Sequence, residues 1–276
     1  MSSTGSLDLI ELARIAEAAA RVGGEIVVNG FGDPNNVREK SPGDWVSDVD
    51  TSSERAIQAL LAEASPDIPF FGEESGGVRS VLEWICDPLD GTANFLHGFP
   101  SVGVSIGLVR DGVPIVGVVH APLLRDTYVA TLGGGATRNG VPLSISRRPP
   151  AQAMVATGFP FRHPDLKDRY LEMFSRTLRT FEDLRRAGAA SLDLAWTAAG
   201  VFDGYFELRL GPWDVAAGAL LVREAGGVVT DWVGDDRAWL NSGDIVVGPG
   251  AVHETILELA RISGIQGSGP AADKIV

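Results

Sequence analysis

The sequence contains one cysteine among its 276 residues, Cys86, so no intrachain disulfide can form. A chain without disulfides suits a reducing compartment, and we expect a cytoplasmic protein. No apolar run is long enough to cross a bilayer. Met1 to Asp8 is polar, where a secretory signal would be basic and then apolar. The sequence therefore predicts neither a membrane partner nor secretion.

Basic residues are also scarce. The chain has 23 Lys and Arg against 36 Asp and Glu, which gives a formal net charge of −13. Because no stripe of Lys and Arg offsets this charge, we do not expect nucleic acid as a partner. The four histidines lack the spacing of a metal site, so we interpret them as structural or surface groups.

Local patterns predict α/β architecture with helices and strands that alternate in the second half. Ser6 is the expected cap of the first helix, and Thr51–Glu54 has the spacing of a capping box. Asp111-Gly112 predicts a hairpin turn, and 29–46 and 133–135 read as loops. The expected helices are 6–28, 51–64, 164–180, 191–200, 213–225 and 252–262. The expected strands are 70–75, 81–86, 102–109, 115–120, 127–131, 141–145, 154–159, 181–186, 204–208, 228–231 and 244–247.

The domain organisation follows from the same survey. We expect one unit over residues 1–263, with an N-terminal α+β part to about 150 and a C-terminal α/β part over 151–263. The small and polar composition of 264–276 predicts a disordered tail.

The segment Asp87–Phe95 carries the clearest chemistry. It places Asp87 and Asp90 three residues apart, where Pro and Gly are expected to end an apolar strand. Carboxylates this close repel each other unless protons or a cation lie between them, and Mg²⁺ prefers such oxygen ligands. Gly91–Asn94 then offers backbone N–H groups at a predicted helix start, where an anion can bind. The combination indicates phosphate-ester chemistry.

Further Asp and Glu residues lie at the ends of predicted helices and strands. Each of them, taken alone, is more often a helix cap or a turn former than a metal ligand. Their joint order, however, resembles the inositol monophosphatase family along nearly the whole chain, from Leu7 to Ile262. The segments that carry the resemblance are Asp44–Asp50 with Glu54, Gly72–Ser75, Asp87–Phe95 and Trp213–Gly218. The resemblance implies a layered αβαβα sandwich, of the inositol monophosphatase and fructose-1,6-bisphosphatase type.

The same resemblance implies two to three Mg²⁺ ions in the site. Glu73, Asp87 and the carbonyl of Leu89 would hold one ion. Asp87, Asp90 and Asp214 would hold a second, and a third would lie near Glu73. Such a pair of ions can clamp the attacking and leaving oxygens of a phosphoryl displacement.

Catalytic roles follow from the same motifs. Thr92 would orient the attacking water, Asp50 would accept a hydrogen bond from Thr92, and Glu73 would share the proton-accepting role. The backbone amides of Gly91 and Thr92 would hold phosphate oxygens. Lys40 and Asp44 would belong to a mobile N-terminal loop that completes the site.

Substrate recognition is expected from the C-terminal half. Segments 157–161, 185–193 and 203–207 resemble the bacterial members of the family. Glu207, the amide of Ala190 and Asp90 would bind ring hydroxyls, since a carboxylate accepts two hydroxyl donors at once. Gly211 stands where animal members carry a histidine, which makes action on several polyol phosphates an open alternative.

The resemblance thus implies a homodimeric, Li⁺-sensitive phosphatase that hydrolyses a small phosphate ester, with myo-inositol 1-phosphate as the expected substrate. Three other substrates stay open, namely histidinol phosphate, fructose 1,6-bisphosphate and 3′-phosphoadenosine 5′-phosphate. A family member with an additional regulatory binding role is a further alternative.

Overall fold

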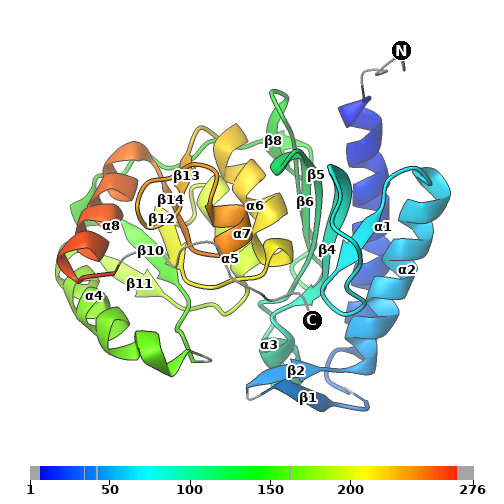
Figure 1. Cartoon of the computed structure of the whole chain (residues 1–276), viewed down its shortest axis with the longest axis horizontal. Helices are drawn as coiled ribbons and strands as arrows, with labels where there is room; N and C mark the ends of the chain where they lie inside the picture. The colour runs from blue at the N-terminus through cyan, green and yellow to red at the C-terminus, as the bar shows by residue number, and fades with distance from the viewer. Residues whose placement is uncertain (1–6, 34, 42, 162, 266–276) are drawn as a thin grey trace.

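The computed structural model describes residues 7–33, 35–41, 43–161 and 163–265. Ser6 and the predicted tail from residue 266 onward lie outside this part of the chain. Helices and sheets stack in five layers across the molecule (Figure 1). This arrangement confirms the αβαβα architecture expected from the sequence.

Helices form three of the five layers. The first covers one face of the larger sheet, the second lies between the two sheets, and the third covers the outer face of the smaller sheet (Figure 1). In this order the layers are α1 (Leu9–Gly30) with α2 (Asp48–Ala64), α5 (Ala190–Ala198) with α6 (Pro212–Glu224), and α4 (Lys167–Thr180) with α8 (Gly250–Ile262). None of the helices in the described ranges is long and apolar enough to cross a membrane.

The larger sheet has seven strands in sequence order. Only its first pair, β3 with β4, is parallel, and the other neighbouring pairs are antiparallel. Asp111 and Gly112 form the turn between β5 and β6, as the sequence predicts. The strands are β3 (Phe70–Gly72), β4 (Leu82–Asp90), β5 (Gly103–Arg110), β6 (Val113–Ala121), β7 (Asp126–Thr131), β8 (Gly135–Arg138) and β9 (Val141–Pro142).

The smaller sheet has five strands in the order β11-β10-β12-β14-β13. Strand β10 pairs in parallel with β11 and β12, and β14 pairs antiparallel with β12 and β13. The strands are β10 (Met154–Thr157), β11 (Asp183–Arg185), β12 (Gly204–Glu207), β13 (Val228–Thr230) and β14 (Ile245–Gly248). Short helical turns complete the chain, namely α3 (Thr92–Leu96), η1 (Pro150–Gln152), η2 (Pro164–Leu166) and α7 (Trp239–Ser242).

Some sequence predictions were wrong in detail. Asp8 caps α1 by accepting from the N–H groups of Ile10 and Glu11. Helix α2 begins one turn earlier than expected, because Ser47 and Asp50 form its capping box. The expected loop over 29–46 contains the antiparallel hairpin β1 (Arg38–Ser41) and β2 (Asp44–Val46). The expected loop at 133–135 is shorter, because strand pairing with β7 starts at Gly135.

Small residues allow the outer helices to approach the larger sheet closely. Ala16, Ala19 and Ala20 of α1 are fully buried. At Gly23 an added Cβ would lie 2.7 Å from Cδ1 of Ile57 on α2, so a larger residue would displace that side chain. This packing leaves β4 covered on both faces, and its last four residues are buried.

Candidate metal and phosphate site

A bulge at the end of β4 puts both of its carboxylates on one side of the sheet. Asp87 pairs with Ser105 of β5, whereas Asp90 pairs with Gly103, so β4 contains one residue more than its partner over this stretch. Residues three apart in a regular strand point to opposite faces, and the extra residue cancels this alternation. The N–H of Leu89 donates to Oδ1 of Asp87 at 2.8 Å and holds the bulge. The strand thus continues through Asp90, and does not end before Asp87 as expected.

Asp214 completes a group of three carboxylates. One oxygen each from Asp87, Asp90 and Asp214 lies within 4.8 Å of the other two. Asp214 occupies the first turn of α6, where the N–H of Gly211 donates to its Oδ2 at 2.6 Å. Three anionic oxygens at this spacing can hold a divalent cation, and hard oxygen donors suit Mg²⁺.

Electrostatics in the group favour a bound cation. Burial raises the pKa of Asp87 well above its usual range, and the charges of Glu73, Asp90 and Asp214 raise it further. Burial and the charges of Asp90 and Glu73 also raise the pKa of Asp214. The pKa of Asp90 is raised to about 6 by burial, although hydrogen bonds from Ser191 lower it. Without a cation the group therefore retains protons near neutrality.

Glu73 lies beside these carboxylates, at the turn after β3. The charge of Glu73 acts on Asp87, although Glu73 is not one of the three closest acids. The ammonium of Lys40 reaches Oε1 of Glu73 at 2.9 Å and Oε1 of Glu74 at 2.7 Å. Burial raises the pKa of Glu73 and raises that of Glu74 to about 7, while Lys40 acts in the opposite direction on both.

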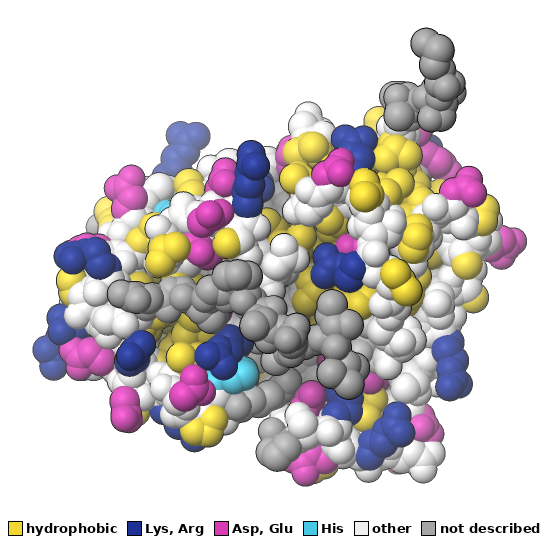
Figure 2. Space-filling model, viewed as in Figure 1, with side chains coloured by type: hydrophobic (Ala, Val, Ile, Leu, Met, Phe, Trp, Pro, Cys, Tyr) yellow, Lys and Arg dark blue, Asp and Glu magenta, His cyan; other side chains and the backbone are white. Residues whose placement is uncertain are grey.

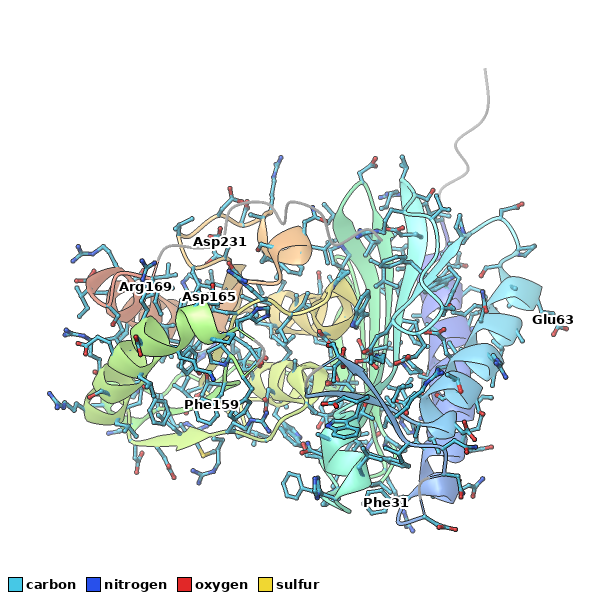
Figure 3. The ribbon with its side chains drawn as sticks, turned by 60° about the horizontal axis from the view of Figure 1, so that its bottom comes forward. Phe31, Glu63, Phe159, Asp165, Arg169 and Asp231 are labelled. Atoms are coloured by element: carbon cyan, nitrogen blue, oxygen red, sulfur yellow. The ribbon has the colours of Figure 1, made fainter. Side chains whose placement is uncertain are left out.

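The hairpin β1–β2 carries the residues predicted for a mobile loop. Lys40 is on β1, and 25% of its side chain is exposed. Asp44 begins β2, is half-buried and is not one of the three clustered acids. Phe31, at the end of α1 and labelled in Figure 3, packs edge to face on Phe95 of α3, and α3 also packs against β2 of the hairpin (Figure 1).

A polar chain fixes the hydroxyl of Thr92. Its Oγ1 lies 3.0 Å from Oδ1 of Asp50 and 3.2 Å from the carbonyl of Leu89. The N–H and hydroxyl of Ser47 donate to Oδ2 of Asp50 at 2.8 and 2.6 Å. Because the Thr92 proton is directed to these acceptors, its lone pairs are free to accept from a water in the site.

Gly91 makes the turn from β4 into α3. Its φ of +89° lies in the left-handed region, and an added Cβ would approach the carbonyl of Ser101 to 2.8 Å. The side-chain amide of Asn94 donates to the carbonyls of Ser101 and Ala187, each at 2.8 Å. The backbone of Gly91 and Thr92 is thereby held against the segment that precedes α5.

The other wall of the site comes from α5 and β12. Ser191 donates from its N–H and hydroxyl to Oδ2 of Asp90, at 2.7 and 2.5 Å, so Ala190 lies next to the carboxylates. Glu207 ends β12, and the hydroxyl of Tyr205 donates to its Oε2 at 2.5 Å. An added Cβ on Gly158 would lie 1.9 Å from the Glu207 carboxylate, so a larger residue would displace that carboxylate.

An aromatic cluster supports this wall. The Phe159 ring packs edge to face against Tyr170 and Phe174 of α4 (Figure 3). Tyr170 in turn hydrogen-bonds to the carbonyl of Gly158 and to the hydroxyl of Thr157. The cluster therefore fixes the glycine that faces Glu207.

Gly211 leaves room for a neighbouring ring. An added Cβ there would lie 2.4 Å from Cε2 of Trp213, and the Trp213 ring packs on Phe71 at 5.7 Å between centroids. The carbonyl of Trp213 accepts from Ser105 of β5 at 2.8 Å. The indole occupies the space that a side chain at position 211 would need.

Five polar residues of the site were part of the sequence motifs but had no role assigned from them, namely Ser47, Glu54, Glu74, Ser191 and Tyr205. The carboxylate of Glu54 accepts from the N–H groups of Glu74 and Ser75, both at 2.8 Å, and shapes the acidic turn. The separation of four residues between Asp50 and Glu54 on one helix was the available signal, since such residues share a face.

Comparison with known proteins gives concordant matches. The sequence profile of the inositol monophosphatase family matches residues 8–264. A putative Nus factor SuhB from Neisseria meningitidis is 43% identical over 247 residues, which cover 87% of this chain and 94% of the relative. A fructose-1,6-bisphosphatase/inositol-1-monophosphatase from Aquifex aeolicus is 38% identical, over 92% of this chain and 97% of the relative. The crystal structure of extragenic suppressor protein suhB from Bartonella henselae superposes with a TM-score of 0.86 at 36% identity, over 90% and 98% of the two chains.

Proposed function

The chain belongs to the inositol monophosphatase family, and we propose that it is a Mg²⁺-dependent phosphatase that hydrolyses a phosphate monoester of a polyol. One observation carries the proposal. The carboxylates of Asp87, Asp90 and Asp214 converge within 4.8 Å, and the oriented hydroxyl of Thr92 lies on the same turn as Asp90. Myo-inositol 1-phosphate is our first candidate substrate.

The donor set supports the metal assignment, because the buried acids have raised pKa values that a cation would relieve. In the proposed arrangement Glu73, Asp87 and the carbonyl of Leu89 would hold one Mg²⁺. Asp87, Asp90 and Asp214 would hold a second, and a third would bind near Glu73. Mg²⁺, when bound, polarises the phosphate oxygens and lowers the pKa of the attacking water.

The remaining chemistry comes from the chain itself. Thr92 accepts a hydrogen bond from the water and orients it, because its own proton is held by Asp50 or the Leu89 carbonyl. Glu73 shares the proton-accepting role. The amides of Gly91 and Thr92 hold the phosphate, at a turn fixed by Asn94.

Polyol recognition is assigned to the opposite wall. Glu207 and the amide of Ala190 bind ring hydroxyls, and Asp90 contributes a further hydrogen bond. Oε2 of Glu207 accepts from Tyr205 at 2.5 Å, and a carboxylate can accept several donors at once. Gly211 has no side chain, and Trp213 fills the space beside it, so position 211 does not restrict the polyol ring of the substrate. The proposed enzyme therefore accepts several polyol phosphates.

A phosphate-release panel tests the activity. Purified protein with Mg²⁺ is given inositol 1-phosphate, fructose 1,6-bisphosphate, histidinol phosphate and 3′-phosphoadenosine 5′-phosphate. Asp90→Asn is compared with Asp168→Asn, which changes an exposed acid on α4. We expect the first variant to lose at least about a hundredfold in kcat and the second to match the wild type. Release from none of the four esters would refute the phosphatase proposal.

A second candidate function is a regulatory binding role beside catalysis. Its support is the name of the Neisseria relative, putative Nus factor SuhB, at 43% identity over most of both chains. Acidic and basic side chains are interspersed on the face shown in Figure 2, and the net charge is −13, so we propose a protein partner.

Catalysis and regulation can be separated with one variant. Wild type and Asp90→Asn are added to an in vitro transcription reaction that responds to Nus factors. Equal effects of the two proteins on read-through would support a regulatory role independent of hydrolysis. No effect of either protein would remove the second candidate.

Sedimentation in the same preparation tests the proposed homodimer.

A further inference from the structure

The buried face of α2 carries three polar side chains that reach the site. Asp50, Ser53 and Glu54 are each at most 3% exposed. Residues three and four apart share one face of a helix, so these groups form a row. Asp50 accepts from Thr92, and the hydroxyl of Ser53 donates to the carbonyl of Pro88 at 3.0 Å. The first two groups therefore bind the end of β4 and the turn that follows it.

Glu54, the third group of the row, binds the acidic turn after β3. Its Oε2 accepts from the N–H of Glu74 and its Oε1 from the N–H of Ser75, both at 2.8 Å. The N–H of Glu73 donates to the carbonyl of Cys86 on β4 at 3.0 Å. Three successive N–H groups are thus fixed, one by β4 and two by α2. The backbone of Glu73 is held between these two elements.

The turn is matched to a carboxylate at position 54. A carboxylate presents an acceptor on each oxygen, whereas a glutamine side chain presents one acceptor and one NH₂ donor. Two N–H groups that approach the two oxygens separately are satisfied only by the carboxylate. An added Cβ on Gly72 would collide with the Glu54 carboxylate, so the backbone of the turn lies directly against it. Glu54 is not one of the three clustered acids, and each of its oxygens accepts from the turn.

We infer that Glu54 is a positioning residue for metal binding, which holds the acidic turn so that Glu73 can serve as a ligand of Mg²⁺. The inference rests on the proposed function, in which Glu73 and Asp87 share an ion, and deepens it. Loss of one of the two hydrogen bonds leaves an N–H of the turn without its partner and frees the turn to shift. Substitution of a residue that orients a metal ligand typically lowers metal affinity by about 10- to 100-fold.

The test compares the wild type with Glu54→Gln, which keeps the shape of the side chain. Glu63→Gln is the control, because it removes the same charge from the last turn of α2, where the side chain is exposed and points away from the ribbon (Figure 3). The metal-free proteins are titrated with Mg²⁺ in a calorimeter. In Glu54→Gln we expect the affinity of the site that contains Glu73 to fall by about tenfold or more. The site formed by the three clustered acids should keep its affinity within about twofold, and Glu63→Gln should match the wild type.

A second comparison separates positioning from the loss of a negative charge. Glu54→Gln is combined with Glu73→Gln, which removes the ligand itself. If Glu54 acts through Glu73, the double variant should bind Mg²⁺ as Glu73→Gln does alone. Equal weakening of both sites in Glu54→Gln, or a further loss of affinity in the double variant, would overturn the inference.

Amide hydrogen exchange in the metal-free wild type needs no variant to fold. The N–H groups of Glu74 and Ser75 should exchange at least about a hundredfold more slowly than in an unstructured chain. Exchange at the unstructured rate would also overturn the inference, because Glu54 would then not hold the turn. A wild type that binds Mg²⁺ but hydrolyses no ester would remove the proposed function alone. A wild type that binds no Mg²⁺ would overturn both.

Discussion

The hydroxyl of Thr92 lies 3.0 Å from Oδ1 of Asp50, although 42 residues separate them in the sequence. Asp50 is held by the capping box of α2, through the N–H and hydroxyl of Ser47. The capping box of α2 and the hydrogen bond proposed to orient Thr92 therefore use the same carboxylate. The first turn of α2 is thus coupled directly to the end of β4.

Replacing Thr92 with Val should lower kcat by about a hundredfold, because the variant removes the group that orients the attacking water. The affinity for Mg²⁺ should change little, since the three clustered acids remain. Steady-state kinetics and calorimetric Mg²⁺ titration measure the two effects. Thr255→Val on α8 is the matched control. A wild-type kcat in Thr92→Val would contradict the role of the hydroxyl.

Without bound metal, the stability of the protein should fall as the pH rises through the pKa of Asp90. The folded pKa of Asp90 is raised to about 6 by burial, above the usual value of 3.8. The folded protein therefore binds more protons than the unfolded chain between about pH 4 and 6, and the charged acid destabilises it above this window. In EDTA, Asp90→Asn should exceed the wild type in Tm at pH 7.5, and the difference should vanish near pH 4.

A difference of about 1 kcal/mol in the free energy of unfolding corresponds to roughly 2–4 °C in Tm for a chain of this size. We therefore expect the Tm of Asp90→Asn in EDTA at pH 7.5 to exceed that of the wild type by about 3 °C or more. Adding Mg²⁺ should reverse the order, because the wild type binds the ion more tightly. Differential scanning fluorimetry at several pH values measures this, with Asp168→Asn as control. A variant that is less stable than the wild type in EDTA at pH 7.5 would contradict the electrostatic argument.

Gly158→Ala should displace Glu207, because the added Cβ would lie 1.9 Å from its carboxylate. We expect KM for inositol 1-phosphate to rise about tenfold, the loss of one hydrogen bond of about 1.4 kcal/mol. The KM for phenyl phosphate should not change. Gly250→Ala is the control, since nothing lies within 4 Å of its added Cβ. Equal shifts for both substrates would place Glu207 outside the polyol site.

Ser191→Ala should shift the acidic limb of the pH–rate profile. The Ser191 hydroxyl donates to Asp90 at 2.5 Å, and this hydrogen bond lowers the pKa of the acid. Loss of this hydrogen bond raises the pKa of Asp90, so the carboxylate ionises at higher pH. The acidic limb of the pH–rate profile therefore moves to higher pH. The displacement should be largest at low Mg²⁺, where protons compete best with the ion. Ser175→Ala on α4 is the control, and an unmoved limb would indicate that Asp90 titration does not govern the rate.

Much of this protein can be predicted from local sequence. Asp111-Gly112 predicted the turn between β5 and β6, and the order of four acidic motifs predicted both the fold and the residue types of the site. Element boundaries were predicted less well, as at α2, where the sequence predicted a capping box at Thr51–Glu54 and the structure has one four residues earlier. Ser47–Asp50 starts the helix because Asp50 is buried there and is also bonded to Thr92. Local propensity alone does not distinguish the two boxes.

The motifs of the chain were sufficient to predict phosphate-ester chemistry with carboxylate metal ligands, because that chemistry depends on residue type and order. The relations among those residues depend on packing. A bulge turns Asp87 and Asp90 to one side, and two layers of helices bury them. Ser191 of α5 donates to Asp90 of β4, although 101 residues separate them in the sequence. Burial and charge proximity set the pKa of each acid, and both arise when distant segments pack together.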